Sequence, residues 1–312
     1  MADKMATREA YGQVLLELGE QYEDLIVMDA DLSGSTKTKD FGKKYPDRFF
    51  NMGIAEQDLM GTAAGLALSG KIVCASSFAM FAAGRAFEVI RNSIGYTGAN
   101  VKICATHAGI TVGEDGASHQ TFEDLAIMRT IPGMTVLCPS DGPSAKALIR
   151  QAVAMEGPCY IRLGRSAVPN VYDENEELTI GKGVTLREGL AVTLAATGIM
   201  VDAALKAADI LAGEGIDARV IDIHTIKPLD EDILIKAALE TGGIVTCEEH
   251  SVIGGLGSAV ASLLAEKCPT RMEMIGQKDT FGESGKPAEL LEKYHMTADD
   301  IAAAARRIAR GR

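Results

Sequence analysis

Residues 106–120, with the sequence THAGITVGEDGASHQ, place two histidines and an acidic pair on a loop interrupted by glycines. Because the apolar stretch VKICA precedes this loop, we expect a buried strand that ends at these polar groups. His107 and His119 bring bases that titrate near neutrality, and the glycines permit a ligand to approach the backbone closely. Each residue alone would be an ordinary loop residue, but together with Glu114 and Asp115 they suit proton transfer on a hydroxylated substrate.

A second candidate is Glu56, in the stretch FNMGIAEQDLMGTAAGLALSG. This stretch predicts an apolar helix rich in glycine and alanine, with Glu56 in its first turn. A glutamate at that place often does no more than favour the helix dipole. The apolar residues around it predict a dry pocket, in which an unpaired carboxylate is costly. These neighbours are Ile54, Ala55, Leu59 and Met60. We therefore expect the carboxyl group of Glu56 either to be protonated or to meet a specific partner.

Two phenylalanines stand beside the predicted strand end in SSFAMFAAGRAFEVIRNS. Phe78 and Phe81 are three residues apart, a spacing that predicts one face of a helix. Such a pair is more often part of a hydrophobic core than of a cofactor site. However, only 5% of this chain is aromatic, so the position of the pair is notable.

Three residues are candidates to bind an anion. They are Arg8 before the first predicted helix, Ser35 in DADLSGST, and Arg165 at the end of YIRLGR. An arginine at a strand end is more often an ion-pair partner, yet its planar fork also suits a phosphate or sulfonate group.

Short apolar segments alternate with amphipathic ones, which predicts mostly parallel sheets flanked by helices, an α/β fold. The first strands are expected in LIVMDAD, KIVCASS, VKICATH, MTVLCPS and CYIRLG. An acidic stretch without periodicity separates them from a second series in LAVTLAATG, ARVIDIHTI, GIVTCEEH and RMEMIG. We predict a first domain over residues 1–165, a linker over 166–180 and a second domain over 181–312. The site is expected at the carboxyl ends of the strands, where open parallel sheets bind ligands.

The composition limits the class of partner. Lys and Arg total 31 against 43 Asp and Glu, and the formal charge of -12 argues against nucleic acid. No apolar stretch is long enough to cross a bilayer, so we expect a cytoplasmic protein without membrane contact. The six cysteines form no C-x-x-C pair, so we expect reduced thiols and no metal ligand in this chain. GGLGSAV lacks the full G-x-G-x-x-G spacing and predicts a tight turn between strand and helix.

Several motifs, taken in order, resemble the pyrimidine-binding domain of transketolases. They are MATREA, DADLSGS, NMGIAEQ, SSFAMF, THAGITVGEDGASHQ and RLGRS. VIDIHTIKPLD and EEHSVIGGLGSAV resemble the C-terminal domain of the same family. The histidine motif is the most specific, because its TH, GEDG and HQ elements match in order and spacing. The resemblance covers essentially the whole chain and implies thiamine diphosphate chemistry.

The resemblance implies a role for each cofactor-binding candidate. Glu56 matches the catalytic glutamate that hydrogen-bonds the ring nitrogen of the aminopyrimidine, and a dry pocket that keeps its carboxyl group protonated suits this task. Phe81, with Phe78 beside it, matches the aromatic residues that pack on the pyrimidine. Asp31 and Leu32 match positions that border the cofactor. In the family another aromatic residue commonly follows three residues after Phe81, where this chain has a glycine, so something else must close the pocket.

The remaining candidates match substrate-binding residues of the family. His107 and His119 match histidines that bind sugar hydroxyls near the reacting carbons, where they help to move protons. Asp115 matches the aspartate that reads the stereochemistry of the donor. The family's phosphate clamp is matched by Arg8, Ser35 and Arg165.

Family members of full length carry a further, upstream domain whose Gly-Asp-Gly motif and downstream asparagine bind the diphosphate through Mg²⁺. This chain has no such motif. The resemblance therefore implies the C-terminal subunit of a split transketolase of the pentose phosphate pathway, which transfers a two-carbon ketol unit from a ketose phosphate to an aldose phosphate. We expect a separate N-terminal subunit to hold the diphosphate and Mg²⁺ or Ca²⁺, an active site at the interface, and a heterotetramer.

Three alternatives stay open. The beta subunit of a 2-oxo-acid dehydrogenase shares the domain pair and the glutamate, but a small 2-oxo acid needs neither the histidines nor the phosphate clamp. A relationship to 1-deoxyxylulose-5-phosphate synthase is weaker. A non-catalytic assembly subunit could keep the same fold, and the presence of every catalytic-type residue argues against it.

Overall fold

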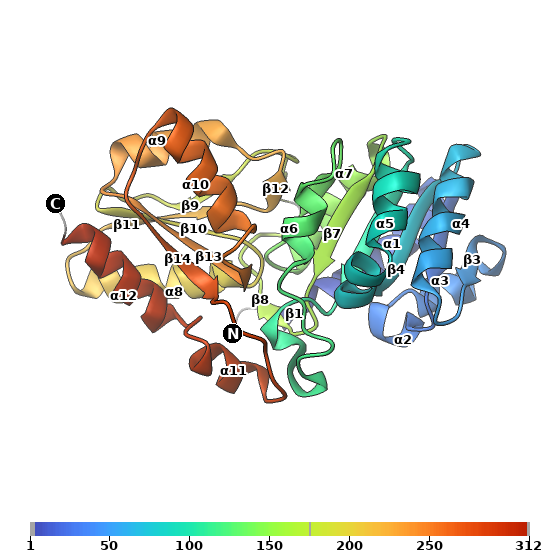
Figure 1. The fold of residues 1–312 in the computed structure, drawn as a ribbon, viewed down its shortest axis with the longest axis horizontal. Coiled ribbons are helices and arrows are strands. Elements are labelled where there is room, and N and C mark those ends of the chain that lie inside the picture. Colours follow the sequence, from blue (N-terminus) through green and yellow to red (C-terminus); the bar gives the residue numbers. More distant parts are fainter. Residues whose placement is uncertain (1–3, 175, 311–312) are drawn as a thin grey trace.

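The computed structural model describes residues 4–174 and 176–310 and contains two principal sheets with helices around them (Figure 1). Most neighbouring strands run parallel, which confirms the predicted α/β fold. A short antiparallel pair joins β1 (Lys4–Met5) to β8 (Val168–Pro169), so the predicted linker contains a strand.

The first sheet has seven strands in the order β12-β6-β7-β5-β4-β2-β3. All its pairs are parallel except β12 with β6. The strands are β2 (Leu25–Asp29), β3 (Phe49–Asn51), β4 (Ile72–Phe78), β5 (Val101–Thr106), β6 (Thr135–Leu137), β7 (Cys159–Leu163) and β12 (Thr225–Lys227). The helices of this part are α1 (Thr7–Gln21), α2 (Ser33–Thr36), α3 (Lys39–Lys44), α4 (Glu56–Leu68), α5 (Phe87–Val89), α6 (Asp124–Arg129) and α7 (Gly142–Ala154).

Helices cover both faces of this sheet, so successive strand residues enter different cores. In β2, Ile26 and Met28 pack in one core with side chains of α4 and α6, whereas Leu25 and Val27 pack in another with α1 and α7. Side chains alternate across a strand, and a strand buried on both faces must therefore be apolar throughout. This is why continuous apolar runs were correct signals for these strands.

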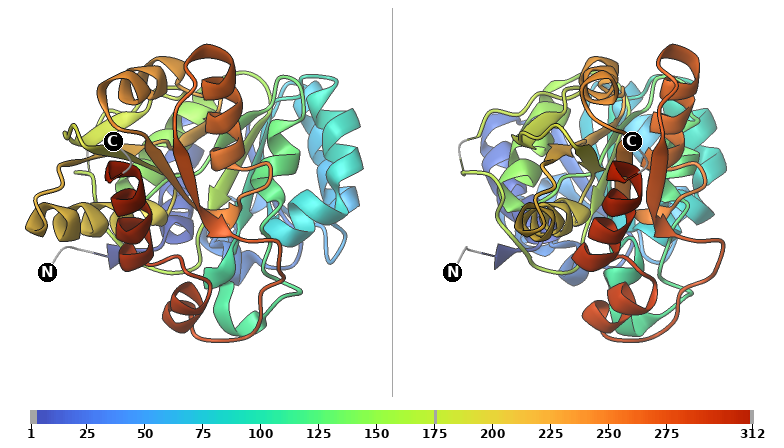
Figure 2. Two further views of the ribbon diagram at one scale, coloured as in Figure 1. Left: turned by 60° about the vertical axis from the view of Figure 1, so that its left-hand side comes forward. Right: turned by 90° about the vertical axis from the view of Figure 1, so that its left-hand side faces the viewer.

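The second sheet has the order β14-β13-β10-β11-β9, and only β9 is antiparallel to its neighbour. Its strands are β9 (Val184–Arg187), β10 (Val192–Ala196), β11 (Ala218–Asp222), β13 (Ile244–Ser251) and β14 (Met272–Gln277). The helices of this part are α8 (Met200–Gly213), α9 (Glu231–Glu240), α10 (Leu256–Lys267), α11 (Pro287–Lys293) and α12 (Ala298–Ala309). Figure 2 shows α8 and α12 close together beside this sheet, and both share a core with β10.

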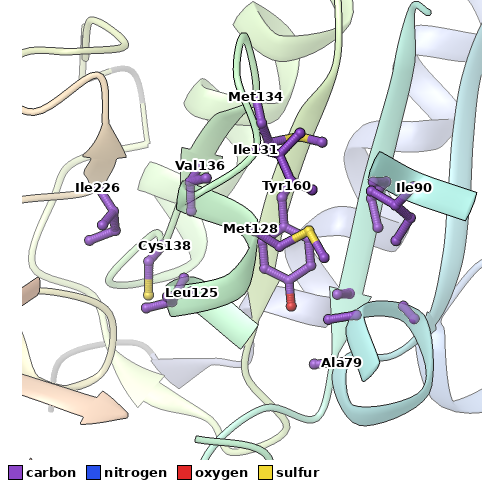
Figure 3. Close-up of a cluster of buried hydrophobic side chains, with 14 of the residues drawn as sticks. Ala79, Ile90, Leu125, Met128, Ile131, Met134, Val136, Cys138, Tyr160 and Ile226 are labelled. Carbon is purple, nitrogen blue, oxygen red and sulfur yellow. The ribbon is translucent and has the colours of Figure 1, made fainter. Parts of the chain in front are cut away.

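The stretch ARVIDIHTI, predicted as one strand of the second sheet, is divided between the two sheets. It leaves the second sheet after Asp222, and Thr225 then pairs with Leu137 of β6 in the first sheet. Ile226 is buried in the same hydrophobic cluster as Val136 (Figure 3). The domain boundaries given above stay a prediction, because a strand from beyond residue 181 completes the first sheet.

GGLGSAV forms the expected tight turn into a helix. The carboxylate of Glu248 accepts hydrogen bonds from the backbone N–H groups of Leu256 at 2.7 Å and Gly257 at 2.8 Å. A Cβ atom at Gly255 would lie 2.0 Å from Oε2 of Glu248, so a side chain would be excluded there. A carboxylate of the chain itself therefore occupies the N-terminal end of α10, a place where helices commonly bind anions.

Two further observations concern whole-chain properties. All six cysteines are free, and five of them are buried, as small apolar residues are. Across residues 4–174 and 176–310, the structure contains no helix with the length and apolar character needed to span a membrane.

Candidate active site

Several of the predicted site residues lie at or just after the carboxyl ends of four neighbouring strands, β7, β5, β4 and β2, whereas Arg8 lies in α1 and Glu56 begins α4. Phe78 is the last residue of β4, and His107 directly follows β5. The segment with Asp31 and Leu32 follows β2, and Arg165 lies two residues after β7. Because parallel strands end at the same edge of a sheet, these side chains lie together at the edge where the site is expected.

Four aromatic rings form a cluster at this edge. The rings of Phe78 and His107 are stacked with centroids 3.9 Å apart, and the ring of His119 meets that of Phe81 edge-on at 5.3 Å. Phe78 and Phe81 are themselves 6.2 Å apart. The segment 106–120, called the histidine loop below, therefore folds back onto the two phenylalanines.

The prediction that Phe78 and Phe81 share a helical face is wrong. Phe78 belongs to β4 and pairs with Thr106 of β5, and Phe81 lies in a π-helical segment, Met80–Arg85. Pairing of β4 with β5 extends the strand through Phe78 and overrides the helical spacing.

Glu56 is the first residue of α4, and only 2% of its side chain is exposed. Of the two expected alternatives, the structure shows a specific partner: Nη1 of Arg85 lies 2.9 Å from Oε2 of Glu56. The guanidinium of Arg85 also lies over the ring of Phe81, 5.1 Å from its centroid. Glu56 and the aromatic cluster thus share one cation, which the sequence analysis missed. The position of Arg85, four residues after Phe81, was the sequence feature that could have indicated this contact.

The expected dry pocket around Glu56 is only partly present. Leu59 and Met60 are fully buried, but Ile54 is 79% exposed. The helix buries the face that points into the sheet, whereas Ile54 precedes the helix and points outward. The prediction that Ile54 helps to dry the pocket is therefore wrong for this chain on its own.

His107 is 3% exposed and has a positive φ of 56°. Its Nδ1 atom is 2.9 Å from the hydroxyl of Thr106, and its Nε2 atom is 3.3 Å from Nη1 of Arg8. Burial, and then the positive charges of Arg8 and Arg165, lower the pKa of His107 to about 3. The imidazole is therefore neutral at physiological pH and held in a backbone conformation that is strained for a residue with a side chain.

Arg8, Ser35 and Arg165 lie around His107, but only part of the predicted clamp is in direct contact. Nη1 of Arg8 donates to the backbone carbonyl of Ser35 at 2.9 Å. Nη1 of Arg165 donates to Glu114 at 2.8 Å and to the carbonyl of Val112. Nε of Arg8 is buried and has no hydrogen-bond partner among the described residues. A buried donor in this state fits a site that takes an anionic acceptor.

The loop after β2 depends on Asp29, whose role the sequence analysis did not identify. The carboxylate of this buried residue accepts hydrogen bonds from the N–H of Leu32 at 2.6 Å and from the hydroxyls of Thr36 and Thr38 at 2.6 and 2.9 Å. Burial raises the pKa of Asp29, and these hydrogen bonds oppose the rise. An Asp followed by serines and threonines is a signal for such local hydrogen bonding.

Asp31 and Asp115 lie further from the rings. Asp31 has a positive φ of 62° and exchanges two hydrogen bonds with Asn51, of 3.0 and 3.1 Å. Asp115 is exposed at the end of a 3-10 helical segment, Ile110–Asp115, in the histidine loop. The structure thus brings Asp31 into a local turn and leaves Asp115 at the surface of the isolated chain.

We predict that the imidazole of His107 stays neutral when the pH is lowered from 7 to 4. In the unfolded chain a histidine gains its proton near pH 6.5, so the free energy of unfolding is expected to fall as the pH drops from that value towards about 3. NMR titration of the His107 ring protons measures this directly. In Arg8→Ala the pKa of His107 should rise, and a wild-type midpoint near 6.5 would contradict the burial of a neutral ring.

Comparison with known proteins relates both parts of the chain to transketolases. The model of the transketolase pyrimidine binding domain matches residues 3–171, and that of the transketolase C-terminal domain matches residues 181–301. A putative transketolase C-terminal section from Methanocaldococcus jannaschii is 52% identical over 95% of this chain and 93% of its own length. A 6-deoxy-6-sulfo-D-fructose transketolase subunit from a Clostridium species is 44% identical over 96% of this chain and 94% of its own length.

A solved structure supports the same assignment. A split gene transketolase, described as an inactive beta4 tetramer, superposes with a TM-score of 0.92 and is 55% identical, covering 98% of this chain and 99% of its own. Both halves of the chain match transketolase domains, and the matched relatives include sections of divided enzymes, so this chain belongs to the transketolase family.

Proposed function

We propose that this chain is the C-terminal subunit of a two-chain transketolase, which transfers a two-carbon ketol unit from a ketose phosphate to an aldose phosphate. The observation that carries the proposal is the buried carboxyl group of Glu56, which shares Arg85 with a cluster of two phenylalanine and two histidine rings. A non-catalytic subunit would not need to bury a carboxyl group beside such a cluster.

A separate N-terminal subunit completes the proposed enzyme, with two copies of each chain in the cytoplasm. The relatives named as a C-terminal section and as a subunit support division of the enzyme into two chains. The split gene relative made of four beta chains alone is described as inactive, which fits an enzyme that needs another chain. Among the described residues, no group of three or more His, Cys, Asp or Glu side chains could hold a metal ion. We therefore assign Mg²⁺ or Ca²⁺, with the diphosphate, to the partner.

The site fits the pyrimidine half of thiamine diphosphate. Glu56 would hold a ring nitrogen of the aminopyrimidine, and Phe78 and Phe81 offer aromatic faces for it to pack against. Arg85 is 52% exposed and can turn towards solvent when its place beside Glu56 is taken. When bound, the cofactor would supply the electron sink that is needed to break and form carbon–carbon bonds beside a carbonyl group.

The histidines serve the substrate in this proposal. His107 is neutral, Thr106 holds its Nδ1 atom, and its Nε2 atom lies 3.3 Å from Nη1 of Arg8. On substrate binding, Nε2 would instead accept a hydrogen bond or a proton from a sugar hydroxyl. His119 packs edge-on to Phe81 on the opposite arm of the histidine loop and would bind a second hydroxyl. Asp115 would read the configuration of the donor, and Asp31 and Leu32 would border the cofactor.

The acid group of the substrate would lie against Arg8 and Arg165. The unpaired Nε of Arg8 supplies one donor. Arg165 is held by Glu114, an exposed residue of the histidine loop, through Nη1, and its remaining guanidinium N–H groups would donate to the anion. A charged head group of this kind favours ketol transfer over the chemistry of a 2-oxo-acid dehydrogenase.

Thiamine diphosphate with Mg²⁺ is expected to bind only after the chain is mixed with an N-terminal transketolase subunit. The reason is that the diphosphate and its metal ion are assigned to that partner. Calorimetric titration of the chain alone and of the mixture measures the difference. Tight binding to the chain alone would show that it carries its own diphosphate site, and turnover of pyruvate but not of ketose phosphates by the mixture would favour a 2-oxo-acid dehydrogenase.

Glu56→Ala should lower the turnover of the assembled enzyme by at least about 10², the usual effect of losing a group that acts in proton transfer. Asp58→Ala is the matched control, because Asp58 lies in the same helical turn, is exposed, and accepts a hydrogen bond from the hydroxyl of Thr62 at 3.4 Å. Ketol transfer between sugar phosphates is the assay. Full turnover in Glu56→Ala would remove Glu56 from the proposed machinery.

Arg165→Ala should weaken phosphorylated substrates far more than unphosphorylated ones, because it removes a charge-assisted contact worth roughly 1.5–3 kcal/mol. The ratio of kcat/KM for the two substrate types measures the effect. Arg187→Ala is the control, since Arg187 is similarly exposed and ion-paired with Asp209 in the second half of the chain. Equal losses on both substrate types would assign Arg165 a structural role only.

A further inference from the structure

The histidine loop is held by residues of the second half of the chain. It packs beside α11, as Figures 1 and 2 show, although α11 follows the loop by more than 160 residues. One such contact is made by Glu249 of β13. Oε1 of Glu249 accepts a hydrogen bond from the backbone N–H of Thr111 at 2.6 Å.

The start of the loop is shaped to receive this carboxylate. Gly109 has a positive φ of 81°, and a Cβ atom there would lie 2.3 Å from Cδ of Glu249. Only a glycine therefore lets the carboxylate reach the N–H of Thr111. Glu249 is 4% exposed, so water does not offer the N–H an equal alternative acceptor.

Two neighbouring glutamates of β13 perform separate tasks. Side chains alternate along a strand, and Glu248 accordingly turns to α10 while Glu249 turns to the histidine loop. The strand end itself is fixed to the first sheet, because Nη2 of Arg162 donates to the backbone carbonyl of Glu249 at 2.8 Å. Arg162 is in turn ion-paired with Asp124 at 2.9 Å. The carboxylate of Glu249 is thus presented to the loop from a rigid support.

A second contact fixes the far end of the loop. Nε2 of Gln120 donates to the backbone carbonyls of Ile110 at 3.2 Å and Glu283 at 2.9 Å. A Cβ atom at Gly116 would lie 2.5 Å from Oγ of Ser284. The segment before α11 therefore holds the part of the loop that leads to His119, while Glu249 holds the part that follows His107.

We propose that Glu249 is a positioning residue for the histidine loop, acting through the N–H of Thr111 to hold His107 and His119 over the substrate. The inference rests on the function proposed for these histidines. It gives the second half of the chain a part in catalysis without any contact with substrate. Small displacements of a catalytic group have large effects on rate, so a residue that fixes the loop affects turnover.

Two substitutions separate the hydrogen bond from the charge. Glu249→Asp keeps the negative charge but withdraws it from Thr111 by one methylene, whereas Glu249→Gln removes the charge and keeps an acceptor at the same reach. Glu248→Asp is the matched control on the same strand, because it shortens a side chain of equal burial that serves α10. All three variants keep a polar side chain at the buried position.

Amide hydrogen exchange of the isolated chain is the first measurement. In Glu249→Asp, the amides of residues 109–116 should exchange about tenfold faster, the size expected from losing a hydrogen bond to a charged acceptor, and those of β4 and β10 should not change. Glu249→Gln should remain within about threefold of wild type, because its amide oxygen still accepts from Thr111. Glu248→Asp should leave the loop unchanged. Unchanged loop exchange in Glu249→Asp, or equal acceleration in Glu248→Asp, would overturn the proposal.

Kinetics of the assembled enzyme form the second measurement. Glu249→Asp should lower kcat about tenfold with an unchanged calorimetric Kd for thiamine diphosphate, and Glu249→Gln should recover most of the loss. Normal kcat in Glu249→Asp beside accelerated loop exchange would show that the loop is held for stability alone. If the wild-type complex transferred no ketol unit, the proposed function would fail, while the exchange experiment would still decide whether Glu249 positions the loop.

Discussion

Parallel pairing of β7, β5, β4 and β2 is the constraint on which the rest of the structure depends. It brings four chain segments to one edge of the first sheet, although they are separated by many residues in the sequence. Two apolar cores, one on each face, enforce this pairing because every strand is buried on both sides. The segments that leave these strands carry most of the polar candidate side chains, although Ala30, Ala79 and Ala108 still belong to a core. The strands themselves therefore stabilise the fold, and the segments that follow them carry the candidate site residues.

Burial of ionisable groups near this edge is balanced by specific partners. Arg85 neutralises Glu56, the hydroxyls of Thr36 and Thr38 serve Asp29, and His107 avoids charge altogether. A buried charge without such a partner would be strongly destabilising. The hydrogen-bond and ion-pair partners therefore orient each buried ionisable group before substrate binds. If a bound group replaces Arg85 as the hydrogen-bond partner of Glu56, the change in the site is confined to this one ion pair.

The sequence was informative wherever a single local pattern determined the outcome. Apolar runs located most of the strands, and motif order led to the correct family, because both signals lie within short stretches. It failed where distant segments compete: pairing with β5 drew Phe78 into a strand, and pairing with β6 drew Thr225 into the first sheet. Arg85 and Glu249 were missed for the same reason, whereas Asp29 bonds to the nearby Thr36 and Thr38 within its own loop. Their partners are set by the fold or by loop geometry, which no periodicity records.

The crossing of β12 into the first sheet has a further consequence for how the chain can be divided. Removing everything after the linker would leave β6 as an open edge with unpaired backbone groups, next to apolar side chains that Ile226 now covers. Exposed edges of this kind pair readily with other chains and promote aggregation. Proteolytic cleavage or gene truncation between the two halves would therefore yield a first fragment that aggregates rather than a domain that folds independently. In the whole chain, β12 of the second half covers this edge.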